Sequence, residues 1–252
     1  MRDKVKILNV EIDKISQEEL LAQLKRGVLV TPNVDQIVKM QKDRKYYDIV
    51  RRAEWCVCDS KILYLCSRLL GRSLPEAIPG SSFFPAFCDY HKNDQNCKIF
   101  LLGAMEGVAK KAMKRINSRI GRPIVVGAYS PSYGFEKKQN ENEEIYRMVN
   151  SSSANVVLVG VGCPKQEKWI DKHKAMMPGV DIWMALGATI DFEAGNIKRA
   201  PLIWRKLYME WFYRFLQEPR RMYKRYFVDD PIFFWYFFKQ LLGLYKNPFS
   251  NE

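Results

Sequence analysis

The stretch NVVLVGVGCPKQE, residues 155–167, combines a strand, a glycine turn and a helix start, and it decides the fold class. After Asn155 the segment is apolar without polar alternation, which is typical of a strand buried on both faces of a parallel sheet. Gly160 and Gly162 end the strand and allow the backbone to approach a ligand closely. Pro164 suits the first position of a helix, whose exposed amides favour anions. The stretch therefore predicts a ligand-binding turn between a buried strand and a helix.

Similar apolar runs recur along the chain, and helical patterns separate them. The expected strands lie at 5–10, 28–30, 55–58, 98–103, 123–129, 155–162 and 181–188. The expected helices lie at 60–70, 108–116, 138–150 and 164–177, with a further helix capped by Ser16 and Glu19. This order predicts an α/β fold, a Rossmann-like and mostly parallel sheet with helices on both faces.

Ligands in such sheets bind at the carboxyl ends of the strands, so the residues that follow each strand are the candidate site. They are Thr31, Asn33, Asp59, Gly103, Gly162, Pro164, Lys165, Gln166, Gly187 and Asp191. Asp59 is placed to act as a general base toward an acceptor hydroxyl, or else it caps the helix that begins at Ser60. Thr31 and Asn33 either cap the following helix or hydrogen-bond a ligand hydroxyl.

Several common chemistries do not fit the pattern. The turn at 160–165 lacks Walker A spacing, and no G-x-G-x-x-G opens a helix there, which disfavours a dehydrogenase. No D-x-D pair follows a strand, and we expect His91 and His173 on the surface rather than at a metal. The six cysteines lack zinc-like spacing and are expected to be reduced, with Cys56 and Cys58 packing along a strand. No metal or cofactor is therefore expected.

The charge of the chain favours anionic partners. Its 252 residues include 41 basic and 28 acidic side chains, a formal net charge of +13. Such an excess suits nucleic acid, anionic lipid or phosphorylated substrates. The start of the chain does not read as a signal peptide, and no run of about 18 apolar residues occurs, so we expect a cytoplasmic protein without a spanning helix.

The last fifth of the chain differs from the rest, since 17 of the 33 aromatic residues lie after residue 200, among many basic ones. This composition is typical of helices at a membrane interface, although such helices also pack on a core or on a partner. The six successive aromatics at 233–238 cover every side of a helix and cannot all face one core. We expect a core at 1–195 and a basic, helical, membrane-associated appendage at 196–252. Arg214 and Arg221 are seven residues apart, and share one helix face if Pro219 does not break the helix, so they are candidates to balance a leaving diphosphate.

The chain resembles the bacterial WecG/TagA/CpsF glycosyltransferases, glycosyltransferase family 26, over nearly its whole length. The matching stretches are TPNVD at 31–35, the strand ending at Asp59, FLLGA at 100–104, VGVGCPKQE at 159–167, DFEAGNIKRAP at 191–201 and EWFYRFLQEPRR at 210–221.

The resemblance implies a metal-independent, inverting transferase that uses a UDP-sugar such as UDP-N-acetylmannosamine. The implied acceptor is a sugar on a polyprenyl diphosphate, such as undecaprenyl diphosphate, in making teichoic acid linkage units, enterobacterial common antigen or capsule. It implies that Asp59 is the catalytic base, that Thr31 and Asn33 shape the pocket and that Gln166 contacts a ligand. The residues implied to close over the diphosphate are Arg214, Arg221, Lys224 and Arg225. It also implies peripheral attachment at the inner face of the cell membrane.

One departure bears on the donor. The family usually has Asp-Gly where this chain has Asp59-Ser60. The transferred sugar could therefore be N-acetylmannosamine or a hexose such as glucose or galactose.

Two rival functions are a basic nucleic-acid-binding protein and an inactive nucleotide-binding scaffold in a polysaccharide assembly complex. We expect no nucleic-acid partner. A homo-oligomer could hide part of the aromatic surface.

Overall fold

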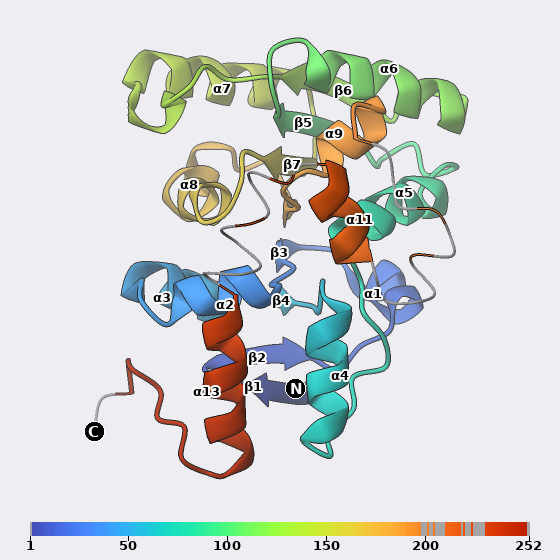
Figure 1. Ribbon diagram of the computed structural model, residues 1–252. Coiled ribbons are helices and arrows are strands. Elements are labelled where there is room, and N and C mark those ends of the chain that lie inside the picture. Colours follow the sequence, from blue (N-terminus) through green and yellow to red (C-terminus); the bar gives the residue numbers. More distant parts are fainter. Residues whose placement is uncertain are drawn as a thin grey trace.

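A six-stranded parallel sheet forms the centre of the molecule (Figure 1). The computed structural model describes residues 2–197, 201, 204, 210–217, 219, 223 and 230–250. In spatial order the strands are β4 (Trp55–Cys56), β3 (Gly27–Val30), β8 (Ile182–Ala185), β7 (Val156–Gly160), β5 (Ile99–Gly103) and β6 (Val125–Tyr129). Every neighbouring pair in this sheet is parallel. The predicted parallel sheet is confirmed.

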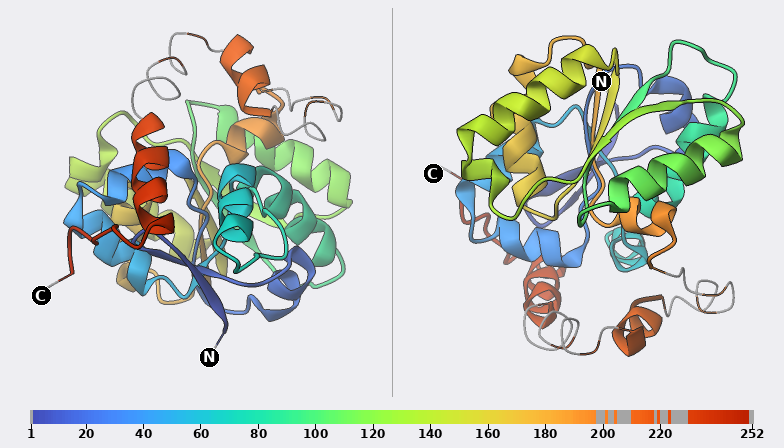
Figure 2. Two further views of the ribbon diagram at one scale, coloured as in Figure 1. Left: turned by 60° about the horizontal axis from the view of Figure 1, so that its bottom comes forward. Right: turned by 90° about the horizontal axis from the view of Figure 1, so that it is seen from above.

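Two layers of helices cover the sheet, as the view from above shows (Figure 2). One face carries α2 (Val34–Met40), α3 (Arg44–Arg52), α4 (Lys61–Leu69), α7 (Gln139–Ser151) and α8 (Lys165–His173). The other carries α1 (Gln17–Gln23), α5 (Gly80–Tyr90), α6 (Val108–Ile120) and α9 (Thr189–Ala194). Short 3-10 turns lie at η1 (Phe135–Lys137) and η2 (Lys174–Met176). Along β7 the side chains alternate between the two cores, Val157 and Val159 facing one and Leu158 the other, and all are buried. This double burial explains why the strands lack polar alternation.

The expected single strand at 5–10 is wrong, because the chain turns back on itself there. Strands β1 (Lys4–Ile7) and β2 (Val10–Asp13) form a separate antiparallel hairpin. Its two-residue turn places Leu8 in the left-handed region at φ 53°. Leucine rarely adopts this conformation, and the turn contains no Gly-Asn or Asp-Gly signal, so periodicity alone could not find it.

The predicted capping of the first helix by Ser16 and Glu19 is confirmed. Ser16 caps α1, its hydroxyl accepting from the Glu19 amide while the Glu19 carboxylate accepts from the Ser16 amide. This reciprocal pair satisfies two amides that the first helical turn would otherwise leave without partners.

The carboxyl-terminal segment 230–250 packs on the core. Helix α13 (Pro231–Leu241) buries Phe233 and Phe237 in the cluster that includes α2. The Gln240 carboxamide accepts a hydrogen bond from the Leu8 amide at 2.7 Å and donates one to the Lys6 carbonyl at 3.0 Å. Helix α11 (Glu210–Gln217) lies near α9 in Figure 1. Within the described ranges, no helix combines the length and apolarity needed to cross a bilayer.

Candidate active site at the strand ends

The loops that follow β3 and β4 are hydrogen-bonded to each other. The Asp59 amide donates to the Pro32 carbonyl at 3.2 Å, which places Asp59 beside the Thr31 turn. Thr31 is buried, and Asn33 caps α2 by accepting from the Gln36 amide at 3.1 Å. Helix capping is therefore the structural function of Asn33, and its side chain stays within the turn that borders Asp59.

Asp59 is not the N-cap residue of the helix that follows it. The N-cap of α4 is Ser60, whose hydroxyl accepts from the Ile62 amide at 3.2 Å. The carboxylate of Asp59 instead accepts from the Gly80 amide at 3.0 Å, at the first residue of α5. This contact, across 21 residues of sequence, fixes the orientation of the carboxylate at the carboxyl edge of the sheet. It leaves the general-base interpretation of Asp59 as the hypothesis that fits its position.

The turns after β7 and β8 are joined through Gln166. Its side-chain oxygen accepts from the Gly187 amide at 3.1 Å, and its amide nitrogen donates to Glu167 at 2.9 Å. The backbones also approach closely, because a β-carbon added to Gly160 would lie 2.6 Å from the Gly187 carbonyl oxygen. One added to Gly103 would lie 2.4 Å from the Gly160 carbonyl oxygen. Glycine is required at both positions so that these strand ends can touch.

The two pairs of turns also meet. A β-carbon added to Gly80, whose amide binds Asp59, would lie 3.1 Å from the Leu186 side chain and 3.4 Å from the Thr189 hydroxyl. Leu186 directly precedes Gly187. The structure therefore brings Thr31, Asn33, Asp59, Gln166 and Gly187 to one edge of the sheet. The connections after β3 and β7 turn to one face and the connection after β8 turns to the other, and ligands bind where such connections diverge.

The other predicted site residues lie in the turn after β7 and at the start of α8, in α9 and α11, or outside the described part of the chain. Lys165 lies 3.6 Å from Glu136, to which it is ion-paired, and Pro164 is the N-cap of α8, one residue before the predicted helical position. Gly162 adopts φ 88° in the same turn, and Asp191 is half-buried in the first turn of α9. The backbone of Arg214 belongs to α11. Arg221, Lys224 and Arg225 lie outside the described residues.

Glu167 is a charged residue at this edge to which the sequence analysis gave no role. It is 1% exposed, and burial raises the pKa of its carboxyl from an ordinary value of about 4.5 to about 7. Its second oxygen, Oε2, has no hydrogen-bond partner within the described part of the chain. Glutamate is almost never buried without a partner, so the sequence gave no reason to expect a buried carboxyl at residue 167.

The raised pKa of Glu167 predicts a specific dependence of stability on pH. The folded state holds the proton more tightly than the unfolded chain, so the protonated carboxyl stabilises fully below pH 4.5 and that stabilisation is lost as pH rises through 7. Glu167→Gln does not titrate, so its free energy of unfolding should rise relative to wild type by about 3 kcal/mol between pH 4.5 and 8. Urea unfolding at several pH values measures this difference. Parallel curves for the two proteins would contradict it.

The two histidines are buried, so the expectation that they lie on the surface is wrong. His173 is 5% exposed among Trp169 and Tyr146, and burial lowers the pKa of its imidazole to about 4. His91 is 9% exposed against Phe87. In each case an aromatic residue lies four positions earlier, on the same helix face. For predicting whether the histidine is buried, this spacing is a better guide than the neighbouring lysines. Among the described residues, no group of three or more histidine, cysteine or acidic side chains is placed to hold a metal ion.

Cys56 and Cys58 pack as predicted. All six thiols are free, and Cys56 and Cys58 lie in the same buried cluster, while Val57 between them faces the opposite core.

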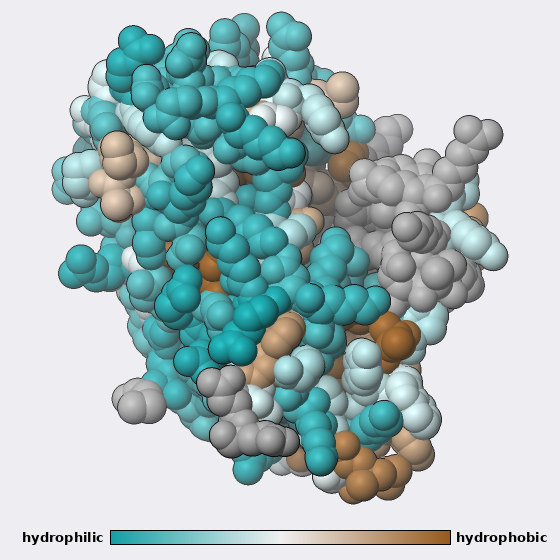
Figure 3. Space-filling view, turned by 90° about the vertical axis from the view of Figure 1, so that its left-hand side faces the viewer, coloured by the Kyte–Doolittle hydropathy of each residue, from teal (hydrophilic) through white to brown (hydrophobic). Residues whose placement is uncertain are grey.

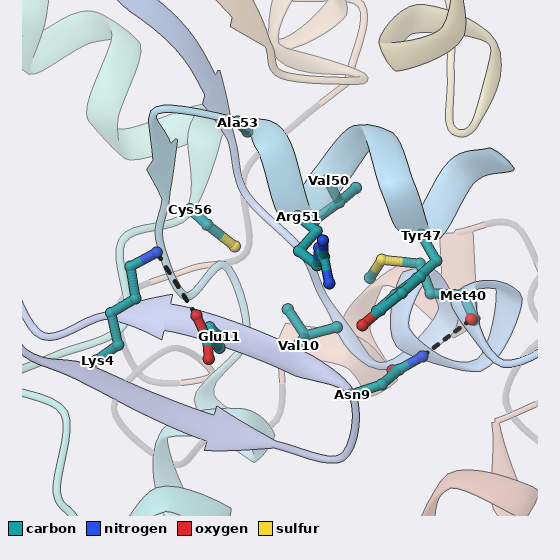
Figure 4. A pocket seen from close by; sticks show the side chains of 10 residues that line it. All are labelled: Lys4, Asn9, Val10, Glu11, Met40, Tyr47, Val50, Arg51, Ala53 and Cys56. Atoms are coloured by element: carbon teal, nitrogen blue, oxygen red, sulfur yellow. Dashed lines mark hydrogen bonds and ion pairs between the residues drawn. The ribbon is translucent and has the colours of Figure 1, made fainter. Parts of the chain in front are cut away.

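A small pocket lies away from these turns, between the β1–β2 hairpin and α3 (Figure 4). The Lys4–Glu11 ion pair spans the hairpin there, and the side-chain Nδ2 of Asn9 donates to the Met40 carbonyl at 3.1 Å. None of the residues that follow the strands of the main sheet at its carboxyl edge lines it, so this pocket is separate from the candidate site.

Comparisons with known proteins show which family this chain is similar to. The family described as "Glycosyl transferase WecG/TagA/CpsF family" matches residues 5–247. A protein of Staphylococcus aureus (strain MW2) is 28% identical over 229 residues, 87% of each chain, and is named N-acetylglucosaminyldiphosphoundecaprenol N-acetyl-beta-D-mannosaminyltransferase. A protein of the same name from Bacillus spizizenii (strain W23) is 29% identical over 202 residues, 80% of this chain and 75% of the relative.

Proposed function

This chain belongs to the WecG/TagA/CpsF family of glycosyltransferases, and we propose that it moves a sugar from a UDP-sugar to a sugar carried by a polyprenyl diphosphate. The bacterial relatives are named for such a transfer to an undecaprenyl diphosphate-linked sugar. The observation that supports the same chemistry in this chain is the placement of Asp59, whose carboxylate is held beside the turns after β3 and β8.

The proposed reaction is a single displacement at the anomeric carbon. Asp59 takes the proton of an acceptor hydroxyl while that oxygen bonds to the anomeric carbon of the donor. The bond between the anomeric carbon and the UDP oxygen breaks, and UDP leaves with the electron pair. Attack from the face opposite to UDP inverts the configuration at that carbon. The Gly80 amide holds one oxygen of Asp59 in place, which reduces the orientational freedom lost during the reaction.

The leaving diphosphate needs positive charge, and basic side chains of the appendage are the proposed source. The guanidinium group matches phosphate oxygens in a two-pronged hydrogen bond, which makes Arg214 and Arg221 suited to the role. Lys224 and Arg225 extend the same basic stretch. We further propose that residues 1–195 hold the donor, and that the basic stretch of the appendage with Arg214, Arg221, Lys224 and Arg225 closes over the diphosphate.

Ser60, where the family usually has glycine, has a structural explanation. Its hydroxyl caps α4, and serine stabilises a helix N-terminus better than glycine by a few tenths of a kcal/mol. The substitution therefore does not by itself argue for a different sugar. We propose N-acetylmannosamine or a related hexose as the transferred group.

A donor screen tests this function. Purified protein is incubated with a short-chain prenyl-diphosphate N-acetylglucosamine acceptor and, in turn, UDP-N-acetylmannosamine, UDP-glucose and UDP-galactose. We expect UDP release that requires both substrates, with the same acceptor lacking its sugar as the control. UDP binding without turnover of any donor would favour an inactive scaffold. Tight, salt-dependent RNA binding without UDP binding would favour the hypothesis of a nucleic-acid-binding protein.

An exposed apolar surface supports a membrane location for this reaction. On α13 the side chains of Phe234, Trp235 and Phe238 are each about half exposed, although Phe233 and Phe237 of the same helix are buried. Leu65 and Leu69 of α4 are exposed as well. Figure 3 shows hydrophobic residues gathered at the lower end of the molecule and a mostly hydrophilic upper part. We propose that this surface, together with the basic appendage, rests on the inner face of the membrane that holds the lipid-linked acceptor.

A further inference from the structure

The carboxamide of Gln166 has only one orientation that suits both of its neighbours. Its oxygen faces the Gly187 backbone amide, which can only donate, and its nitrogen faces an oxygen of the Glu167 carboxyl, which can accept whether or not the group is protonated. A flipped carboxamide would place its NH₂ group against the N–H of Gly187, a donor against a donor. Gln166 is 1% exposed, so water cannot replace either partner.

Glu167 is costly to bury and no step of the proposed reaction uses it. No lysine or arginine forms an ion pair with it in the described part of the chain; Lys39 of α2, which is near enough to lower its pKa, pairs with Asp35 at 2.8 Å. The other ionisable groups that face it are the phenol of Tyr46 from α3 and the thiol of Cys163. A buried carboxyl in such surroundings destabilises the fold, and an apolar residue of similar size would not. The energetic cost of burying this carboxyl points to a function for it at this edge.

We propose that Glu167 is a positioning residue that fixes the Gln166 carboxamide and thereby anchors the turn at Gly187. The anchored turn continues into Leu186, which packs where the Gly80 amide holds Asp59. Glu167 therefore acts on the site through Gln166 and the Gly187 turn, without touching substrate. Its effect on transfer rests on the proposed function, whereas its effect on the Gly187 turn does not.

The test combines a local readout with transfer kinetics. Amide hydrogen exchange is followed by NMR in protein labelled with ¹⁵N-glycine, so that Gly187 is observed together with Gly27 and Gly121. The last two amides are hydrogen-bonded to the carbonyls of Asp181 and Asn117, in elements that do not contain Gln166, and serve as reference amides for changes not confined to the Gly187 turn. Glu167→Leu removes the acceptor but keeps most of the volume. Glu167→Gln keeps an oxygen that can accept from Gln166. Lys172→Gln, an exposed position on the same helix, is the matched control.

For Glu167→Leu we expect Gly187 exchange to rise about 3- to 10-fold while Gly27 and Gly121 stay unchanged, because one anchoring hydrogen bond is weakened. We expect kcat to fall about tenfold with little change in the KM for the UDP-sugar, and Glu167→Gln to restore most of both values. Unchanged Gly187 exchange, or an equal rise at all three glycines, would overturn the proposal. If Glu167→Leu does not fold, Glu167→Asp, whose carboxylate is one methylene too short, replaces it with the same expectations. If wild type turns over no UDP-sugar, the proposed function fails, and Gly187 exchange still decides the role of Glu167.

Discussion

Asp59→Asn should lower kcat for sugar transfer by about 1,000-fold and leave the fold intact. A positioned general base contributes about 10²- to 10⁴-fold to such a reaction, and asparagine cannot take a proton. Its side-chain oxygen can still accept from the Gly80 amide, so the contact between the β4 turn and α5 should survive. The variant therefore separates the loss of the base from the loss of structure.

Three measurements make the Asp59 result specific. Steady-state UDP release gives kcat, isothermal titration gives UDP affinity, and urea unfolding gives stability. We expect UDP affinity and stability close to those of wild type. Asp89→Asn is the matched control, because Asp89 is an exposed residue of α5 whose ion pair with Arg119 lies on the surface. Near-normal turnover by Asp59→Asn would remove Asp59 from the role of base.

Replacing Phe234, Trp235 and Phe238 together by serine should lower partition onto anionic vesicles by about 100-fold or more. Each ring is about half exposed, and burying the exposed half in lipid is worth about 2 kcal/mol per ring. The interface buries only part of this area, so the expected loss is smaller than the full sum. Co-sedimentation with vesicles that contain an acidic phospholipid measures the partition.

Substitution is a sharper test of this surface than removal of the appendage. A chain cut at residue 200 would also lose Phe233 and Phe237 from the core and the Gln240 hydrogen bonds to the hairpin. Tyr90→Ser combined with Met176→Ser is the control, because both side chains are about half exposed on other elements. Equal vesicle binding by the triple variant and wild type would show that the attachment surface lies elsewhere.

The strands of the sheet could be predicted from sequence because the pattern that identifies each strand lies within a few successive residues. A strand buried on both faces must be apolar at successive positions, and Val156–Gly160 meets this condition completely. The start of α1 could also be predicted, because the two residues of its capping pair, Ser16 and Glu19, are three positions apart. The hairpin at 4–13 could not be found this way, since its turn depends on Leu8 adopting a conformation that leucine seldom takes.

Strand ends located the candidate site, but contacts between distant turns complete it. The contact from Asp59 to Gly80 and the contact from Gln166 to Gly187 each join two turns that are 21 residues apart. Such contacts follow from the order of strands in the sheet, which hydrophobic periodicity does not specify. The burial of Glu167 was not predicted for a different reason, because charge predicts exposure and only the packed structure shows that this carboxyl is enclosed. The predicted basic residues Arg221, Lys224 and Arg225 lie outside the described residues and stay a prediction.

The hydrogen bond between the Leu8 amide and Gln240 also bears on how the protein is made. Leu8 is fully buried, and its partner is synthesised 232 residues later. While the ribosome is still translating, the hairpin turn lacks this acceptor, and the apolar side of α2 lacks the Phe233 and Phe237 side chains that cover it in the folded protein. A nascent chain released early should therefore be a substrate for chaperones and proteases, and only the chain that reaches α13 completes its amino-terminal hairpin.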